Sequence, residues 1–324
     1  MSATATDSAM MYRALQLARL GAGHVSPNPM VGAVITASDG RIIGEGWHRR
    51  YGSGHAEVNA VASVSEADRH LLPEATIYVT LEPCSHYGKT PPCAKLLIDN
   101  HLRRVVIGAS DPNPLVSGRG VRMLREAGIE VTEGVLADEC RALNSRFMTA
   151  QTLGRPHITL KWAQSADGYM AATDNDGKSY PVQFSTPVTA LDVHRLRAVS
   201  DAIMVGTETV LTDNPSLNTR LWPGCSPRPI LFRSERLPKD AAVMQRDPIL
   251  LNPDCPLADN IRSLWTDYGI SSLIVEGGPT LLRSFIETGL YDRIRVETSD
   301  KILNSGVKAP KIPDNVPNCT LKPA

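Results

Sequence analysis

The chain has 324 residues, of which 42% are hydrophobic and 21% are charged. This length suggests two domains, and the composition allows hydrophobic cores of ordinary size. Lysine plus arginine and aspartate plus glutamate both number 34, so the formal net charge is zero. Nucleic-acid-binding proteins need a basic surface to meet phosphates, and this balance argues against that class. A small anionic substrate remains possible, because a few arginines are enough to bind one phosphate group.

The cysteines and the apolar pattern indicate the compartment. Four of the six cysteines (Cys140, Cys225, Cys255 and Cys319) are scattered, as is typical of ordinary reduced thiols. No stretch is apolar and long enough to span a bilayer. The N-terminal residues lack the basic leader and continuous apolar core of a signal peptide. We therefore expect a cytoplasmic protein without a membrane partner.

The first 50 residues predict a helix followed by a β-hairpin. Asp7 and Ser8 can cap the helix, whose apolar face ends at a pair of glycines. Residues 30–35 and 41–48 have the composition and length of strands, and they flank a Ser-Asp-Gly turn. Asn28 precedes them between two prolines, which hold its side chain in a fixed place. A plain Asx turn is the simpler interpretation of that asparagine.

The next stretch carries a metal-binding pattern. His55 begins a predicted helix, with Glu57 two residues later; Cys84 follows a β-branched strand and Cys93 begins a helix after two prolines. One imidazole and two thiolates are three good zinc ligands, and a catalytic zinc keeps its fourth position for water. Helix N-termini favour the thiolate form of cysteine. The pattern is typical of zinc-dependent nucleobase deaminases, in which the glutamate moves a proton.

The spacing of the cysteines leaves an alternative open. Eight residues separate Cys84 from Cys93, whereas the usual deaminase pattern has two. A structural zinc site normally has four protein ligands, and His86 could be the fourth. We favour a catalytic site, because Glu57 would have no duty in a structural one. We expect His48 to bind substrate or line the pocket rather than bind the metal.

The rest of the first half alternates strands and helices. Residues 104–109 and 128–131 are predicted strands, and residues 120–127 and 137–149 are predicted helices. This alternation predicts a three-layer α/β domain with a mainly parallel sheet.

The second half repeats that alternation after a linker at Gly154, Arg155 and Pro156. Strands are predicted at residues 157–163, 201–206, 229–232 and 271–276, and helices at residues 187–199 and 280–288. Gly277, Gly278 and Pro279 stand between the last strand and the last helix, where a double glycine can cradle a phosphate. The G-x-G-x-x-G pattern is absent, so a Rossmann fold is not indicated, and a plain turn is an equal alternative.

These motifs together resemble the bifunctional deaminase-reductase family of riboflavin biosynthesis. In the first half the resemblance rests on Pro27-Asn28-Pro29-Met30-Val31-Gly32, His55-Ala56-Glu57, Glu82-Pro83-Cys84, Gly88-Lys89-Thr90-Pro91-Pro92-Cys93 and Asp111-Pro112-Asn113. In the second half it rests on residues 161–168, 196–198, 205–209, 213–215, 217, 220 and 275–280. The long insert between the cysteines is a feature of this family. The resemblance implies a cytidine-deaminase-like three-layer α/β/α domain at residues 1–150 and a dihydrofolate-reductase-like α/β domain at residues 155–324.

The resemblance implies two consecutive reactions on one phosphorylated pyrimidine. The first is zinc-dependent hydrolytic deamination of 2,5-diamino-6-ribosylamino-4(3H)-pyrimidinone 5′-phosphate. The second is NADPH-dependent reduction of the ribosyl group to the ribityl chain. In the deaminase, the implied zinc ligands are His55, Cys84 and Cys93, the proton carrier is Glu57, and the substrate-binding residues are Asn28, His48, Lys89 and Asn113.

The resemblance also implies the residues of the reductase site. Lys161 and Glu276 would be catalytic and would orient the opened sugar. The implied substrate-binding residues are Ser179, Arg197, Leu217 and Arg220, with the two arginines on the phosphate. The implied NADPH-binding residues are Ala163, Phe184, Thr209, Asp213, Gly277, Gly278, Pro279 and Thr280. We expect a homo-oligomer.

The chain departs from the family at three places, one of which is Arg233, where an aspartate would be expected after the strand. The loop after Ser179 is extended and lacks the tryptophan that the family usually has there. After Val296 the apolar strand pattern is weak and the tail is rich in proline, so we expect the last strands to be shortened or replaced.

Two other functions share the zinc motif. An editing deaminase acting on transfer RNA would predict a basic surface and would leave residues 155–324 without a task. A zinc-stabilised scaffold without catalysis would keep its fold and its binding after Glu57→Gln, whereas an enzyme would lose turnover with zinc still bound.

Overall fold

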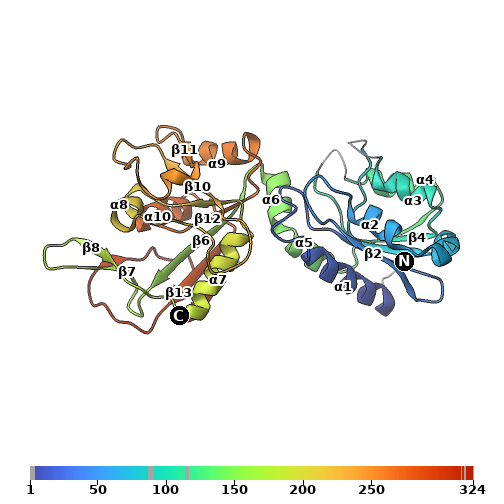
Figure 1. Ribbon diagram of the computed structural model, residues 1–324, viewed down its shortest axis with the longest axis horizontal. Helices are drawn as coiled ribbons and strands as arrows, with labels where there is room; N and C mark the ends of the chain where they lie inside the picture. The colour runs from blue at the N-terminus through green and yellow to red at the C-terminus, as the bar shows by residue number, and fades with distance from the viewer. Residues whose placement is uncertain (1–3, 87–90, 114–116, 315, 317–318, 324) are drawn as a thin grey trace. The chain divides into compact units, whose positions relative to one another are not determined.

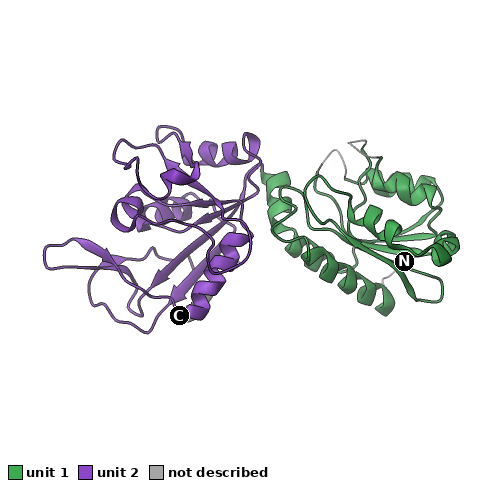
Figure 2. Cartoon of the chain, viewed as in Figure 1, with its two compact units in different colours: residues 1–153 green, residues 154–324 purple. Residues whose placement is uncertain are grey.

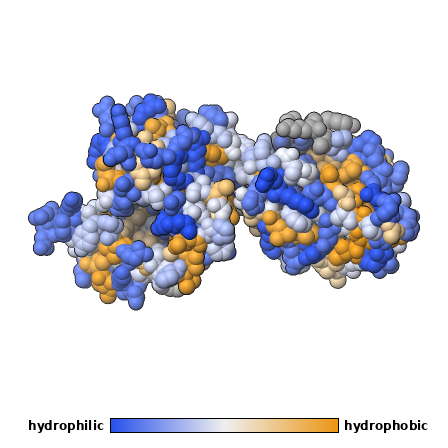
Figure 3. All heavy atoms as spheres, in the orientation of Figure 1, coloured by the Kyte–Doolittle hydropathy of each residue, from blue (hydrophilic) through white to orange (hydrophobic). Residues whose placement is uncertain are grey.

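The computed structural model describes residues 4–86, 91–113, 117–314, 316 and 319–323 (Figure 1). The chain forms two compact units, Met1–Leu153 (unit 1) and Gly154–Ala324 (unit 2) (Figure 2). On the visible face, hydrophilic side chains cover much of the surface and hydrophobic ones lie between them in patches (Figure 3). None of the described helices combines the length and the apolar character that crossing a membrane requires.

Unit 1 is built around a five-stranded sheet of order β2-β1-β3-β4-β5. The strands are β1 (Gly32–Thr36), β2 (Ile42–Trp47), β3 (Thr76–Leu81), β4 (Arg104–Ala109) and β5 (Glu130–Glu133). β1 runs antiparallel to both of its neighbours, whereas β3, β4 and β5 are parallel. Four of the five strands therefore run in the same direction, as predicted for a mainly parallel sheet, and β1 runs against them. A short hairpin can only join antiparallel strands, and it places β1 and β2 beside β3.

Helices cover both faces of this sheet. They are α1 (Ala5–Arg19), α2 (Ala56–Ser63), the 3₁₀ helix η1 (Glu66–Glu74), α3 (Cys93–Asp99), α4 (Arg119–Glu126), α5 (Ala137–Leu143) and α6 (Ser145–Leu153). Ile77 and Val79 of β3 share a core with α2, α3 and α4, whereas Tyr78 between them shares a core with α1 and α5. Alternate side chains of a strand point to opposite faces, so two cores form and the unit has three layers.

Two local predictions in unit 1 were wrong for identifiable reasons. The N-cap of α1 is Thr4, whose hydroxyl accepts from the Asp7 amide while the Asp7 carboxylate accepts from the Thr4 amide. The cap predicted at Asp7 and Ser8 therefore lies inside the helix. The single helix predicted at residues 137–149 divides at Asn144. The side-chain amide of that residue bonds both backbone groups of Met30, at 2.8 and 2.9 Å, and ties the break to the start of the hairpin.

Unit 2 contains a seven-stranded sheet of order β11-β10-β9-β12-β6-β13-β15, in which every neighbouring pair is parallel. The strands are β6 (His157–Gln164), β9 (Ala202–Met204), β10 (Arg228–Phe232), β11 (Ile249–Leu251), β12 (Ser272–Val275), β13 (Arg293–Thr298) and β15 (Cys319–Pro323). A second sheet contains β7 (Tyr169–Thr173), β8 (Ser179–Pro181) and β14 (Val307–Lys308). The helices are α7 (Pro187–Ala198), α8 (Thr207–Asp213), the 3₁₀ helix η2 (Met244–Arg246), α9 (Leu257–Thr266) and α10 (Pro279–Glu287).

The end of the chain differs in part from the expectation. β14 is only two residues long, as expected of a shortened strand. β15, however, pairs with β13 in parallel from Ile294 opposite Cys319 to Thr298 opposite Pro323. The apolar pattern missed this strand because it lies at the edge of the sheet, where polar residues and a terminal proline are tolerated.

Candidate active sites of the two units

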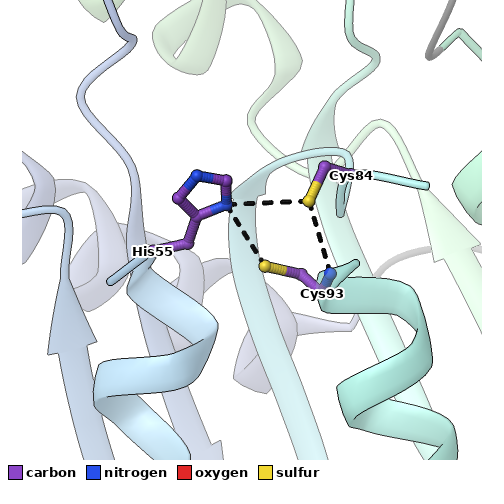
Figure 4. Close-up of side chains that lie close together, drawn as sticks. All are labelled: His55, Cys84 and Cys93. Atoms are coloured by element: carbon purple, nitrogen blue, oxygen red, sulfur yellow. Dashed lines mark hydrogen bonds between the residues drawn. The ribbon is translucent and has the colours of Figure 1, made fainter. Parts of the chain in front are cut away.

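Three side chains that are far apart in the sequence meet in unit 1 and point toward one another (Figure 4). His55 is the N-cap residue of α2, Cys84 follows β3, and Cys93 begins α3. Nδ1 of His55 lies 3.6 Å from Sγ of Cys84 and 3.3 Å from Sγ of Cys93. The backbone amide of Cys93 donates to Sγ of Cys84 at 3.3 Å. Among the described residues, these three form a group whose ligand atoms all lie within 4.8 Å of one another.

The geometry of this group fits a zinc ion. Zinc–sulfur and zinc–nitrogen bond lengths of about 2.3 and 2.0 Å place tetrahedral ligands about 3.5 Å apart. The two nitrogen–sulfur separations of 3.3 and 3.6 Å agree with that value. The Cys93 thiol and amide and the His55 ring lower the pKa of the Cys84 thiol, which favours the thiolate that zinc binds. His86 lines the neighbouring cavity but does not belong to the group of described ligands, and three ligands leave a fourth position open.

Glu57 lies beside the three ligands, in the first turn of α2. Its side chain is buried, with only 3% of the residue exposed. Burial raises the pKa of this carboxyl to about 7, against the opposing effect of the His55 ring. A carboxyl group with such a pKa can take a proton and return it near neutral pH.

A cavity of about 540 Å³ is lined by Glu57 and by two of the three ligands, His55 and Cys84. Asn28, His48 and Asn113 line it, as expected for substrate-binding residues. Nδ1 of His48 lies 3.2 Å from the Gly54 carbonyl oxygen, and its Nε2 lies 3.2 Å from Nδ2 of Asn28. Because the carbonyl can only accept, Nδ1 carries the proton and Nε2 accepts from Asn28. Burial lowers the pKa of His48, which favours this neutral form. Lys89, the fourth predicted substrate residue, lies outside the described residues.

Sequence reasoning missed several residues of the cavity wall, two of which lie on α6. Phe147 and Gln151 both line the cavity from α6. They are four positions apart, so they lie on the same face of that helix. The spacing was visible in the sequence. No local pattern, however, shows that α6 contacts a site whose metal-binding histidine lies some 90 residues earlier in the chain.

Glu82 was recognised only as part of the cysteine motif, and the structure places it at the centre of a hydrogen-bond network. Its carboxylate accepts from the backbone amides of Asp111, Gly118, Gly120 and Val121 at 3.1 to 3.4 Å. The network therefore joins the strand end before Cys84 to the start of the loop that carries Asn113 and to the start of α4.

In unit 2 one predicted catalytic residue, Lys161, lies on β6, and the other, Glu276, directly follows the neighbouring strand β12. Leu160 of β6 pairs with Val275 of β12, so Glu276 follows at the level of Lys161. Arg197 of α7 binds the Glu276 carboxylate through two nitrogens, at 3.1 and 2.6 Å. Burial alone would raise the pKa of Glu276, but the charges of Arg197 and Lys161 hold it below its usual range. The predicted phosphate arginine thus already pairs with the predicted catalytic carboxylate.

The predicted cofactor turn is also assembled in unit 2. A Cβ atom placed on Gly277 would lie 3.1 Å from the Thr209 hydroxyl oxygen, so α8 packs closely on the double glycine. Gly278 has a φ of +69°, which favours glycine, and α10 begins at Pro279 followed by Thr280. A glycine turn at a helix N-terminus suits a phosphate group.

The remaining predicted residues of the reductase site lie on several elements of unit 2 and differ in burial. Ser179 lies on β8, which contacts α8, the helix that ends at Asp213. Phe184 and Leu217 are buried, and Ala163 is half-buried on β6. Arg220 is exposed and donates to the side chain of Asn218, whose backbone carbonyl accepts from Arg197.

Comparisons with known proteins match both units. Residues 156–318 match the RibD C-terminal domain, and residues 4–109 match the zinc-binding region of cytidine and deoxycytidylate deaminases. The riboflavin biosynthesis protein RibD of Actinobacillus pleuropneumoniae is 39% identical to this chain over 339 residues, which cover 96% of this chain and 87% of that protein.

Solved structures are similar to this chain over most of its length. RibD of Acinetobacter baumannii (form 2) is 34% identical, with a TM-score of 0.85, and the match covers 96% of this chain and 91% of that one. The diaminohydroxyphosphoribosylaminopyrimidine deaminase/5-amino-6-(5-phosphoribosylamino)uracil reductase of Thermotoga maritima is 36% identical, with a TM-score of 0.82, and the match covers 96% and 93%.

Proposed function

Because the chain belongs to the RibD family of bifunctional deaminase-reductases of riboflavin biosynthesis, we propose a role in the two reactions for each described site residue. Family membership confirms the two folds and the paired activity that the motifs predicted. A transfer-RNA editing deaminase is not favoured, since it leaves the RibD C-terminal domain of unit 2 unexplained.

For unit 1 we propose deamination of 2,5-diamino-6-ribosylamino-4(3H)-pyrimidinone 5′-phosphate. His55, Cys84 and Cys93 would hold the zinc ion, which when bound supplies a Lewis acid that lowers the pKa of water. Glu57 would take a proton from the attacking water and return it to the ring and to the departing amine. Water adds to the carbon that bears the 2-amino group, and ammonia leaves. The observation that carries this proposal is the buried Glu57 carboxyl beside a three-ligand group.

The cavity wall supports a division of labour in substrate binding. Asn28, oriented by the neutral His48 ring, would contact the base, and Asn113 with Lys89 would hold base and phosphate. Phe147 adds an aromatic surface on which a pyrimidine ring can stack, and Gln151 adds an amide that both donates and accepts.

For unit 2 we propose that NADPH reduces the opened sugar at carbon 1′. The cofactor when bound supplies the hydride, and the protein positions both partners. Thr209, Asp213 and the turn from Gly277 to Thr280 would hold NADPH, together with Ala163 and Phe184. Lys161 and Glu276 would orient the sugar hydroxyl groups. Ser179 and Leu217 would line the substrate, and its phosphate would meet the two arginines that converge on Asn218, Arg197 and Arg220.

A two-step assay on the purified zinc-loaded protein tests both proposals. Ammonia release from the diaminopyrimidine substrate is followed first, and loss of NADPH absorbance second. Glu57→Gln should lower ammonia release by about a hundredfold or more, because general acid–base catalysis is lost. Zinc content and NADPH oxidation with the deaminated substrate should stay at the wild-type level.

Three other outcomes would each contradict one part of the proposed function. No ammonia release from the zinc-loaded wild type would remove the deaminase proposal. Ammonia release without NADPH oxidation would remove the reductase proposal. Wild-type turnover in Glu57→Gln would remove the role of that carboxyl.

Location and assembly stay predictions. Cys140, Cys225 and Cys255 are free thiols, which supports a reducing cytoplasm. A homo-oligomer would be detected by light scattering on the purified protein.

A further inference from the structure

A layer of charged side chains lies between the large sheet of unit 2 and α7. The register pairs Lys161 of β6 with Arg295 of β13, and Ala163 with Glu297. Paired and alternate residues point to the same face, so Lys161, Arg295 and Glu297 share one face of the sheet. The opposite face is apolar and carries Trp162 and Val296. In Figure 1, α7 lies beside β13 at this part of unit 2.

Two of the ion pairs in this layer cross from the sheet to α7. Arg197 binds Glu276 at 2.6 Å, and Asp192 binds Arg295 at 3.2 Å. In each pair a guanidinium group meets a carboxylate within hydrogen-bond distance, and Asp192 has a second cation, Arg195, 3.6 Å away. The charge of Lys161 also acts on Glu276 and lowers the pKa of that carboxyl, but Glu276 is already bound by Arg197.

Glu297 is the carboxylate nearest to Lys161 in the ion-pair geometry. Its Oε2 lies 3.9 Å from Nζ of Lys161 and accepts from the Ser185 hydroxyl at 2.9 Å. A separation of 3.9 Å is too long for a hydrogen bond, so the charges attract without using the N–H donors of the ammonium group. Among the described residues, Nζ of Lys161 makes no hydrogen bond, and its donors are available to a ligand.

The second oxygen of Glu297 points to the same conclusion. The side chain is 4% exposed, and among the described residues Oε1 is buried without a hydrogen-bond partner. A buried carboxylate oxygen without a donor is unfavourable, and such a group calls for an explanation beyond stability. An apolar residue at this position of β13 would avoid that cost but would leave Lys161 to share Glu276 with Arg197.

We propose that Glu297 is a positioning residue of the reductase site, which balances the charge of Lys161 and keeps its ammonium group oriented toward the substrate. The inference rests on the proposed role of Lys161 in orienting the opened sugar. Glu297 acts through Lys161, and Ser185 fixes the carboxylate by binding Oε2. None of the motifs that predicted the reductase site includes Glu297 or Ser185.

Glu297→Gln tests this role, because the amide keeps the size of the side chain and can still accept from Ser185. We expect kcat for NADPH oxidation with the deaminated substrate to fall by about tenfold or more, because a small displacement of a reactive group lowers the rate of the reaction strongly. KM for NADPH and ammonia release should stay unchanged. Asp192→Asn is the matched control: it removes one carboxylate from the same layer, and its kcat should stay at the wild-type level.

A double-mutant cycle separates positioning from a general loss of structure. In a Lys161→Gln background, Glu297→Gln should cause no further loss of kcat, because the residue that it positions is gone. Wild-type kcat in folded Glu297→Gln, equal losses in Asp192→Asn, or additive losses in the cycle would each overturn the inference. Absence of NADPH oxidation in the wild type would instead overturn the proposed reductase function.

A second variant covers the case in which Glu297→Gln does not fold. Ser185 is only half-buried, and Ser185→Ala removes the hydroxyl group that fixes Oε2. We expect a several-fold lower kcat with an unchanged unfolding transition, and wild-type kcat in this variant would overturn the inference.

Discussion

At the scale of single residues, buried charges in both units are held by bidentate arginines. Arg104 binds Asp7 at 2.8 and 3.1 Å, Arg155 binds Asp292 at 2.6 and 3.1 Å, and Arg197 binds Glu276. A planar guanidinium matches both oxygens of a carboxylate, which makes these pairs specific as well as strong. Breaking such a pair leaves the partner charge poorly solvated.

Asp7 gives a pH-dependent prediction. Its burial would raise the pKa, but the Arg104 guanidinium and the Thr4 groups lower it from 3.8 to about 2. A carboxyl whose pKa falls this far on folding contributes about 2 kcal/mol, fully present above pH 4 and lost as the pH falls toward 2. Asp7→Asn should therefore lower the free energy of unfolding at pH 7 by about that amount.

Urea unfolding of the wild type and of Asp7→Asn across this pH range measures the effect. The difference between the two proteins should shrink between about pH 4 and pH 2. A difference that is constant over the range would contradict the ionic origin of the contribution.

At the scale of elements, the active site of unit 1 depends on close backbone packing. α2 begins after His55 and carries Glu57, and it lies directly on β2. A Cβ atom on Gly46 of β2 would come within 2.3 Å of the Ala60 nitrogen and 2.4 Å of the Ala56 carbonyl oxygen. Only glycine at this position lets α2 approach β2 so closely. Because His55 precedes α2 directly, this packing also fixes the position of the metal ligand.

Gly46→Ala should displace α2. Overpacking of this kind costs typically about 1 to 3 kcal/mol, and we expect weaker zinc binding because His55 moves with the helix. Thermal unfolding and zinc retention after dialysis measure the two effects. Gly206→Ala is the control, because the nearest atom to its Cβ would be 3.7 Å away. Zinc retention in Gly46→Ala equal to that of the control would contradict the proposed coupling.

At the scale of the whole molecule, each unit has its own buried cores and its own candidate site. All three predicted zinc ligands and Glu57 belong to unit 1, whereas Lys161, Glu276 and the glycine turn belong to unit 2. The two activities therefore belong to one chain. Among the described residues, no side chain belongs to both proposed sites.

Removal of zinc should separate the activities. A chelator should abolish ammonia release from the full chain, because the three ligands lose their ion. NADPH oxidation with substrate that has already been deaminated should continue at the wild-type rate. Loss of both activities on chelation, with recovery of both on adding zinc, would show that the reductase also depends on the metal.

Spacing along the chain by itself predicted the zinc ligands and Glu57 of unit 1, whereas the reductase residues of unit 2 were implied only by the family resemblance. A histidine, a glutamate two residues later and two cysteines near helix starts indicate a zinc deaminase, because helix and strand ends place such residues predictably. Short-range periodicity likewise located most strands of the two sheets. These signals are local, and they needed no knowledge of which elements are neighbours.

Only the tertiary structure decided which distant groups meet. Phe147 reaches the cavity of a site centred on His55, Glu82 binds the start of α4, and Glu297 faces Lys161 across two neighbouring strands. Such contacts depend on strand order, register and helix packing, which a local pattern does not encode. The edge strand β15 was missed for a related reason: its stability comes from pairing with β13 and not from an apolar pattern of its own.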